Sequence, residues 1–201
     1  MRVRIFIEGG GSANELKRRC RESFRKLLER SGCAGPGLKL VACGPRDSVF
    51  RNFQTAHSTV TSSTEFVAML LDSEDPVDDI ERTWAHLCRR DLSWRKPAKS
   101  RDEQVLLMTT CMETWIVADR NALNAYYRAA VQQSALPSLT NIEAKSRQSI
   151  QRALAHATRN CTERYKKGLN SFKVLATLDP TVLSQHLPSF RRVHRILNEK
   201  R

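Results

Sequence analysis

The sequence predicts an α/β fold, in which a mostly parallel sheet is flanked by helices and followed by a helical, basic C-terminal extension. Two observations support this prediction. Short apolar runs alternate with amphipathic segments up to about residue 131, as in strands joined by crossover helices. From Gln132 onward no further strand pattern follows. We therefore expect an α/β core over residues 1–131 and a basic helical extension over residues 132–201, with a single domain as the alternative.

The first strand and helix are predicted from residues 1–31. Apolar side chains alternate over Val3–Ile7 and the run ends at Glu8, which is typical of a short buried strand. The stretch SANE, Ser12–Glu15, has the form of a capping box at a helix start. Apolar residues then recur at helical spacing, so the helix is expected to end near Ser31.

The remaining elements continue the alternation. A proline opens the second helix, and the third strand is six apolar residues followed directly by acid. We expect strands over 37–44, 66–72 and 104–110, and helices over 45–57, 77–90, 111–130, 141–160 and 189–198.

Composition indicates an ordinary globular protein. Of 201 residues, 40% are hydrophobic, which is enough for a core. No apolar stretch approaches the roughly 20 residues that cross a bilayer, and Glu8 interrupts the start too early for a signal peptide. We expect a cytoplasmic location and no membrane association. Six cysteines are dispersed without metal-binding spacing, so we interpret them as free thiols.

The net charge of +13 is unevenly distributed. Residues 1–60 carry 12 Lys+Arg against 5 Asp+Glu, and residues 121–201 carry 14 against 4. Residues 61–120 are acidic, with 8 basic and 12 acidic side chains. Basic flanks of this size attract a polyanion such as nucleic acid, although a charged surface kept for solubility is an equal alternative.

Acidic residues follow three of the predicted strands. Glu8 ends the first; Asp72, Glu74 and Asp75 end the third; Glu113 follows the fourth. Because the carboxyl ends of parallel strands meet at one edge of the sheet, these acids should converge there. Clustered carboxylates are stabilised by divalent cations such as Mg²⁺ or Mn²⁺, which can drive phosphodiester chemistry. For each acid taken alone, a helix-capping role is the competing interpretation.

Three glycines, Gly9, Gly10 and Gly11, follow Glu8. Without Cβ atoms they permit a tight turn and let the phosphate of a ligand approach the main chain. The stretch GGGSANELK matches neither GxGxxG nor GxxxxGK[ST], which argues against a dinucleotide site.

The strand IFIEGG with glutamate at its end, followed one α/β unit later by LLDSED, resembles the TOPRIM fold. This metal-dependent domain occurs in topoisomerases, bacterial primases and nucleases of the overcoming-lysogenization-defect type. The signatures METWIVAD at 112–119 and LDPTVLSQHLPSFRR at 178–192 resemble, more narrowly, a TOPRIM-like bacterial family classed as a domain of unknown function. Its genes often lie beside an ABC-type ATPase gene in defence neighbourhoods.

The resemblance implies a function and roles for the acids. It implies a Mg²⁺- or Mn²⁺-dependent nuclease acting on DNA or RNA, with its active site in residues 1–131 and an ATPase as partner. Glu8 would be a metal ligand or general base and Asp72 the first acid of a DxD-like motif. Aspartate is expected two residues later, but this chain has Glu74 and then Asp75, so either could be the second ligand. Glu113 would be a further metal ligand.

Basic residues are the expected nucleic-acid contacts, from the first helix and from the stretch ERYKKG: Lys17, Arg18, Arg21, Arg164, Lys166 and Lys167. Two other functions stay open. The departure at Glu74 fits a non-catalytic nucleic-acid or ATPase-binding subunit with a degenerate site. A third possibility is an enzyme that acts on mononucleotides.

Overall fold

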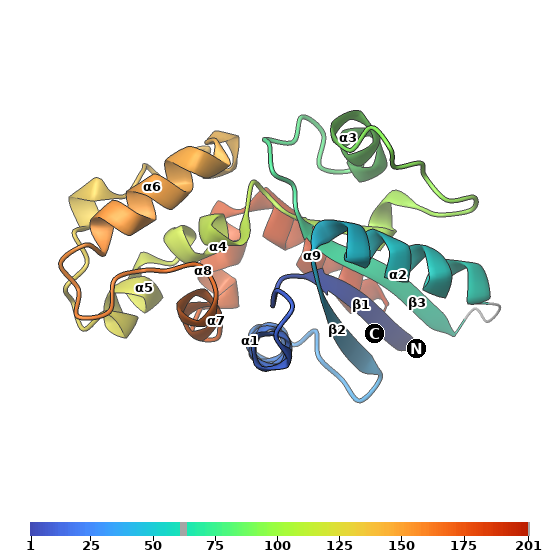
Figure 1. Cartoon of the computed structure of the whole chain (residues 1–201), viewed down its shortest axis with the longest axis horizontal. Coiled ribbons are helices and arrows are strands. Elements are labelled where there is room, and N and C mark those ends of the chain that lie inside the picture. Colours follow the sequence, from blue (N-terminus) through green and yellow to red (C-terminus); the bar gives the residue numbers. More distant parts are fainter. Residues whose placement is uncertain (61–63, 201) are drawn as a thin grey trace.

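A computed structural model describes residues 1–60 and 64–200 (Figure 1). Its strands are β1 Arg2–Glu8, β2 Leu38–Gly44, β3 Glu65–Asp72 and β4 Val105–Met108. Its helices are α1 Asn14–Arg30, α2 Arg46–Thr59, α3 Thr83–Arg90, α4 Met112–Ala118, α5 Arg120–Tyr126, α6 Arg147–Ala157, α7 Leu169–Leu175, α8 Pro180–His186 and α9 Pro188–Glu199. Short 3₁₀ turns lie at Asp102–Gln104, Gln133–Ala135 and Ile142–Ala144.

The four strands form one parallel sheet in the order β2-β1-β3-β4. In the middle of β1, Ile5 pairs with Leu40 of β2 on one side and with Ala68 of β3 on the other. Every neighbouring pair is parallel, so each connection must cross over the sheet, which requires the intervening helices. The predicted α/β fold, with a parallel sheet flanked by helices, is confirmed.

Side chains that alternate along the strands divide the core in two. Ile5 and Ile7 of β1 pack in the larger apolar cluster, together with α1 and the helices that follow β4. Phe6, between them, packs on the other face with α2 and α3. In Figure 1, α2 covers this second face of the sheet. Both faces are buried, which explains why the strands read as nearly continuous apolar runs.

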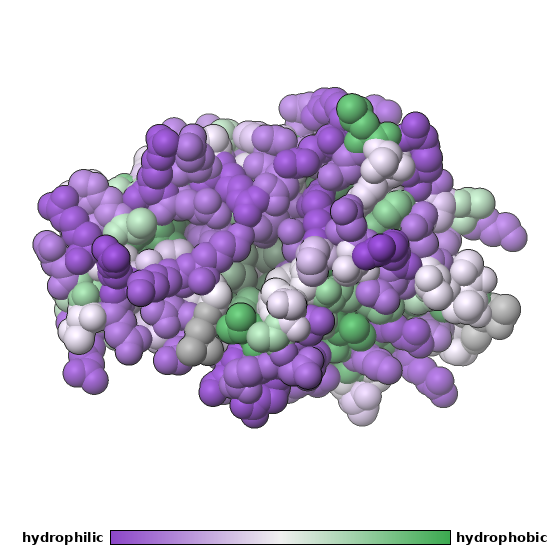
Figure 2. Space-filling view, in the orientation of Figure 1, coloured by the Kyte–Doolittle hydropathy of each residue, from purple (hydrophilic) through white to green (hydrophobic). Residues whose placement is uncertain are grey.

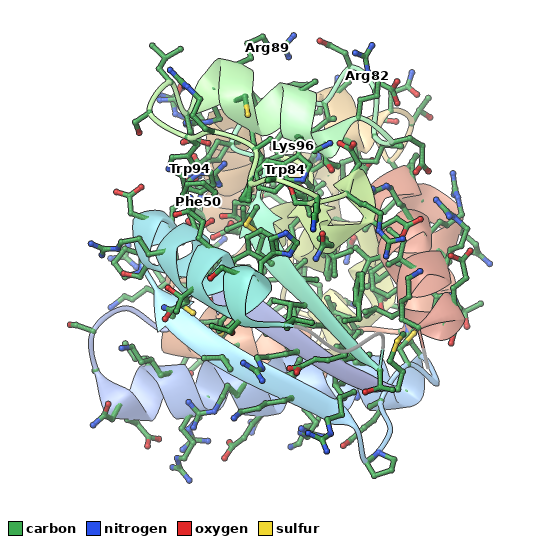
Figure 3. All side chains as sticks on the ribbon, turned by 90° about the vertical axis from the view of Figure 1, so that its right-hand side faces the viewer. Phe50, Arg82, Trp84, Arg89, Trp94 and Lys96 are labelled. Atoms are coloured by element: carbon green, nitrogen blue, oxygen red, sulfur yellow. The ribbon has the colours of Figure 1, made fainter. Side chains whose placement is uncertain are left out.

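The smaller cluster is built from aromatic rings. Phe50 of α2 stacks on Trp94 with ring centroids 4.1 Å apart and lies edge-on to Trp84 of α3 at 6.3 Å. Figure 3 shows these three side chains between the two helices, with Arg82 and Arg89 pointing outward from α3. Each aromatic pair of this geometry stabilises the fold by about 0.5–1.5 kcal/mol beyond the stabilisation from burying its apolar area.

The helices after residue 131 share the larger cluster with the sheet. Trp115 of α4 is buried and lies edge-on to Phe24 of α1 and Phe190 of α9, at centroid distances of 6.5 and 5.0 Å. Arg192 of α9 is also buried, and its guanidinium donates 2.9 Å to the carbonyl oxygen of Val105 at the outer edge of β4. Helix α9 therefore covers one edge of the sheet and contributes to its core.

Two predicted helices differ from the observed ones: one is divided and the other is shorter. The helix expected over 111–130 is divided into α4 and α5 because the Asp119 carboxylate accepts the N–H of Ala122 and starts a new helix. The same carboxylate accepts the Asp179 N–H at 2.7 Å, which fixes the break against the segment before α8. The helix expected over 77–90 begins only at Thr83, and the residues before it form a loop.

Other boundaries also differ from the prediction. The capping box at Ser12–Glu15 is absent: Ala13 is the N-cap of α1 and makes no side-chain cap, and Glu15 pairs with Arg18 and Arg19 one turn later. The helix expected over 141–160 is reduced to α6, preceded by a 3₁₀ turn. Helices α7 and α8 were not expected. The last helix, predicted over 189–198, is confirmed as α9.

Glu143 caps the N-terminus of α9. Its carboxylate accepts the backbone N–H and the hydroxyl of Ser189. Burial raises the pKa of Glu143 to about 7, against the opposing effect of the two donors on Ser189.

The turn after β1 depends on close backbone packing. Gly44 has φ +80° and exchanges two 3.0 Å hydrogen bonds with Gly9, and a Cβ on it would lie 2.5 Å from the carbonyl oxygen of Gly11. In the part of the chain that is described, no helix is long and apolar enough to cross a membrane.

Replacing Gly44 by alanine should destabilise the fold. The Cβ would meet backbone, and φ is positive, so we expect Gly44→Ala to lower the free energy of unfolding by about 1–3 kcal/mol in urea titrations. Gly35→Ala is the matched control, because its Cβ would have no neighbour within 4 Å, and it should change stability by less than about 0.5 kcal/mol. Equal stability of both variants would contradict the close packing.

Glu143 should make stability depend on pH. Between its unfolded pKa near 4.5 and its folded pKa of about 7, the unfolded chain loses the proton while the folded chain keeps it. The contribution of Glu143 to the free energy of unfolding therefore falls as pH rises through this window and is constant above it. In Glu143→Gln, the difference in unfolding free energy between pH 5 and pH 8 should shrink by about 1–3 kcal/mol relative to the parent. An unchanged difference would show that Glu143 does not titrate with folding.

Candidate active site

A pocket of about 360 Å³ opens at the carboxyl ends of the strands. Its lining comes from the ends of all four strands, the turn after β1, the first turn of α1, the start of α4, and the basic segment before α7 together with the start of α7. The residues are Glu8, Gly9, Gly10, Gly11, Leu16, Gly44, Pro45, Asp72, Met108, Met112, Lys167, Gly168, Ser171 and Phe172. In Figure 1, α4 to α7 lie beyond this edge of the sheet.

Glu8 lies at the end of β1 and is tied to the neighbouring strand. Its Oε2 accepts the backbone N–H of Asp72 at 3.2 Å and the Arg46 guanidinium at 3.4 Å. Arg46 also donates to the carbonyl oxygen of Asp72 at 2.6 Å and pairs with Asp91 at 2.8 Å. Two strands and α2 therefore fix the position of the Glu8 carboxylate.

Asp72 is the buried acid of the pocket, with 5% of its surface exposed. Its Oδ1 accepts the backbone N–H of Met112 at 2.8 Å. Its Oδ2 lies 3.9 Å from Lys167 Nζ and 4.0 Å from Arg147 Nη2. Burial, together with the charges of Glu8 and Glu113, raises the pKa of Asp72 to about 7, against the lowering effect of Lys167 and Arg147.

Glu74 and Asp75 are held by arginines outside the pocket. Glu74 has φ +69°, donates its N–H to the Thr110 carbonyl at 2.8 Å, and forms a close ion pair with Arg147. Asp75 has a side chain that is 68% exposed and pairs with Arg90 at 3.2 Å. Glu74 thus reaches Asp72 through a shared arginine, and Asp75 lies at the surface.

Glu113 is fully buried beneath the pocket and is not among its lining residues. Its Oε1 accepts the Tyr165 hydroxyl at 2.9 Å. Its Oε2 is buried without a hydrogen-bond partner in residues 1–60 and 64–200. Tyr165 belongs to residues 163–168, the segment between α6 and α7 that we call the basic strap. The observed contact makes Glu113 an anchor of this strap.

Among the described residues, no group of three or more His, Cys, Asp or Glu side chains is arranged to hold a metal ion. Glu8 and Asp72 alone share the pocket as acids. Mg²⁺ is commonly bound by one or two carboxylates together with water and substrate phosphate. The two oxygen donors beside open volume therefore fit Mg²⁺ or Mn²⁺ that arrives with a phosphate.

Cations from four separate segments pair with the acids in and beside the pocket. Arg46 is in α2, Arg90 at the end of α3, Arg147 at the start of α6 and Lys167 in the basic strap. Arg90 continues the network, lying 3.5 Å from Asp91 and 3.8 Å from Glu74. Sequence reasoning missed all of these except Lys167. No spacing along the chain signals them, because each is brought to the edge by a different element.

The other predicted nucleic-acid contacts lie on the surface. Lys17 flanks the glycine turn, and its side chain lies beside Gly44. Arg18 is exposed and paired with Glu15 at 2.8 Å. The remaining exposed residues of the predicted set are Arg21, Arg164 and Lys166. Figure 2 shows that hydrophilic side chains cover most of the face that carries α1 and α6.

Removing the Tyr165 hydroxyl should leave Glu113 buried without any donor. We expect Tyr165→Phe to lower the free energy of unfolding by about 1–3 kcal/mol, measured in urea. Because two apolar partners of similar shape leave no unsatisfied group, the double variant Tyr165→Phe/Glu113→Met should be more stable than Tyr165→Phe alone. Tyr126→Phe, on a half-buried tyrosine of α5, is the control and should be near neutral. A double variant less stable than the single one would contradict the pairing.

Comparison with known proteins places the chain in a family. Residues 7–198 match the model of a domain of unknown function, DUF4276. The match runs from the end of β1 to the last turn of α9, so it includes every strand end and the basic strap. Neither a curated protein nor a solved structure matches the chain. The chain belongs to the DUF4276 family.

Proposed function

We propose that this protein is a metal-dependent, phosphodiester-cleaving nuclease of the TOPRIM type that acts on DNA or RNA. One observation carries the proposal. Glu8 and Asp72, at the ends of adjacent parallel strands, line one pocket, and Lys167 lies 3.9 Å from Asp72. Two oxygen donors for a hard cation thus lie beside a positive charge for a phosphate.

Glu8 and Asp72 would hold Mg²⁺ or Mn²⁺. When bound, such an ion polarises a phosphoryl oxygen and lowers the pKa of a bound water. The protein's own residues supply position and charge. Arg46 and the Asp72 N–H orient Glu8, and the Met112 N–H orients Asp72, so both carboxylates are fixed before a ligand arrives. Such preorganisation lowers the cost of reaching the reactive geometry.

Lys167 and Arg147 would bind the phosphate. Both lie about 4 Å from Asp72 Oδ2, which is beyond direct hydrogen-bond distance. Their donors are therefore available to a phosphate that binds beside that oxygen. Lys167 is exposed and lines the pocket. In this arrangement the basic strap carries phosphate-binding charge to the acidic edge of the sheet.

The TOPRIM resemblance supports the same assignment. In that fold, a strand-end glutamate and a following acidic motif form the metal site, and Glu8 and Asp72 correspond to these positions. Glu74 and Asp75 are held by Arg147 and Arg90, so we assign neither as a ligand in the ligand-free state. We also propose an ABC-type ATPase as partner and a role in defence, on the resemblance alone.

A second candidate function is a non-catalytic nucleic-acid or ATPase-binding subunit with a degenerate site. The observation that favours it is the ion pair between Glu74 and Arg147, because it occupies the acid expected as second ligand. Calorimetric titration separates the two functions. A nuclease should bind Mg²⁺ or Mn²⁺ in a manner that Glu8→Ala abolishes, whereas the degenerate subunit should bind neither ion.

Cleavage assays test the nuclease proposal directly. Purified protein, alone and with its ATPase partner, is incubated with plasmid DNA and total RNA in Mg²⁺, Mn²⁺ or EDTA. We expect metal-dependent cleavage that falls at least about 100-fold in Glu8→Ala and in Asp72→Ala. Asp78→Ala is the matched control, since Asp78 lies in the same acidic segment but is exposed and outside the pocket. Cleavage that survives both active-site substitutions would refute the proposal.

A further inference from the structure

The acid at the centre of the site is reached through a confined space. Asp72 is 5% exposed and faces a pocket of about 360 Å³. This volume is at the lower end of the range for pockets that enclose a small molecule. The part of a substrate that carries a phosphate to Asp72 must therefore be no larger than a small-molecule ligand.

The lining of the pocket is partly apolar and partly charged. Leu16, Pro45, Met108, Met112 and Phe172 supply the apolar surface. Glu8, Asp72 and Lys167 supply the charges. A nucleotide has the matching character, because its base has two apolar faces and its phosphate is anionic. Bases bind to apolar and aromatic side chains irrespective of sequence.

The glycine turn leaves room beside the pocket. Gly11 has φ +52°, and a Cβ placed on it would have no neighbour within 4 Å, so the space in that direction is open. Gly9 packs against Phe172, whose ring lies 3.5 Å from where a Cβ would be. A larger residue at Gly9 would therefore push on the apolar wall, and the absence of side chains keeps the pocket open to a ligand backbone.

Further positive side chains lie near the residues that line the pocket. Lys17 stands beside the glycine turn, and Arg147 is 28% exposed beside Asp72. Lys166 and Arg164 are exposed on the basic strap. Lys17 and Arg147 thus lie beside residues that line the pocket, and Lys166 is next to Lys167 in the chain, so these charges can bind the phosphates on either side of a nucleotide in the pocket.

From these observations we infer that the pocket receives one unpaired nucleotide of a single strand of DNA or RNA, with its base against the apolar lining residues and its phosphate at Lys167. In a duplex the base is paired and stacked, and extruding it costs a few kcal/mol. The substrate class is therefore a single strand or an unpaired segment. This inference rests on the proposed function, since it assigns the substrate of the same site.

Binding assays in EDTA test the inference without cleavage. A short fluorescent single strand, as DNA and as RNA, is compared by anisotropy at about 150 mM salt with the same sequence as a blunt duplex. A third probe is a strand of abasic sugar phosphates, which has the same charge and no bases. We expect the single strand to bind at least about 10-fold more tightly than the duplex. It should bind about 5- to 100-fold more tightly than the abasic strand.

A variant that fills the pocket is the second test of the inference. Leu16→Trp places an indole at the partly exposed Leu16 and should weaken single-strand binding about 5- to 100-fold while leaving duplex binding within about twofold. Ala85→Trp adds the same group at an exposed site on α3, outside the pocket, and should change neither. Because the abasic comparison uses the unmodified protein, it holds even if Leu16→Trp fails to fold.

Each outcome decides the question. Equal affinity for single strand and duplex, or for the natural and abasic strands, would overturn the inference. So would unchanged single-strand binding by folded Leu16→Trp. If the single-strand preference holds but no metal-dependent cleavage is found, the nuclease proposal fails and the pocket assignment stands. If closed duplex is cleaved as fast as single strand, the nuclease proposal stands and the pocket assignment fails.

Discussion

The concentration of carboxylates at the carboxyl edge of the parallel sheet is the constraint on which the rest of the structure depends. Glu8 and Asp72 cannot move apart, because the Asp72 N–H donates to Glu8 and the strands that carry them are hydrogen-bonded neighbours. Burial of such charges is costly unless they are paired. Arg46, Arg147 and Lys167, each from a different part of the chain, offset part of this cost.

The C-terminal region contributes residues to the acidic edge of the sheet. Trp115 joins α1 and α9 in the same apolar cluster, and Tyr165 ties the basic strap to the buried Glu113. The strap in turn brings Lys167 to within 3.9 Å of Asp72. An acidic strand edge and a basic extension, far apart in sequence, thus form one electrostatic unit, and the family match extends over both.

Sequence patterns predicted the sheet well and the helices after it less well. β1 to β4 lie at the predicted apolar runs, because strands buried on both faces carry apolar side chains at nearly every position. Helix boundaries depend on partners that are distant in sequence. Asp119 divides a predicted helix because it accepts N–H groups from both Ala122 and Asp179, and no local pattern records the second of these contacts.

The sequence by itself determined the α/β class, the convergence of Glu8 with Asp72 and the uneven charge, since all three follow from local periodicity and from the geometry of parallel strands. Only the tertiary structure decided which acids share the pocket. It placed Glu113 against Tyr165, and Glu74 and Asp75 against arginines, while Lys167 reached the acidic edge. The physical reason is that burial and ion pairing arise from elements that meet only when the chain is folded.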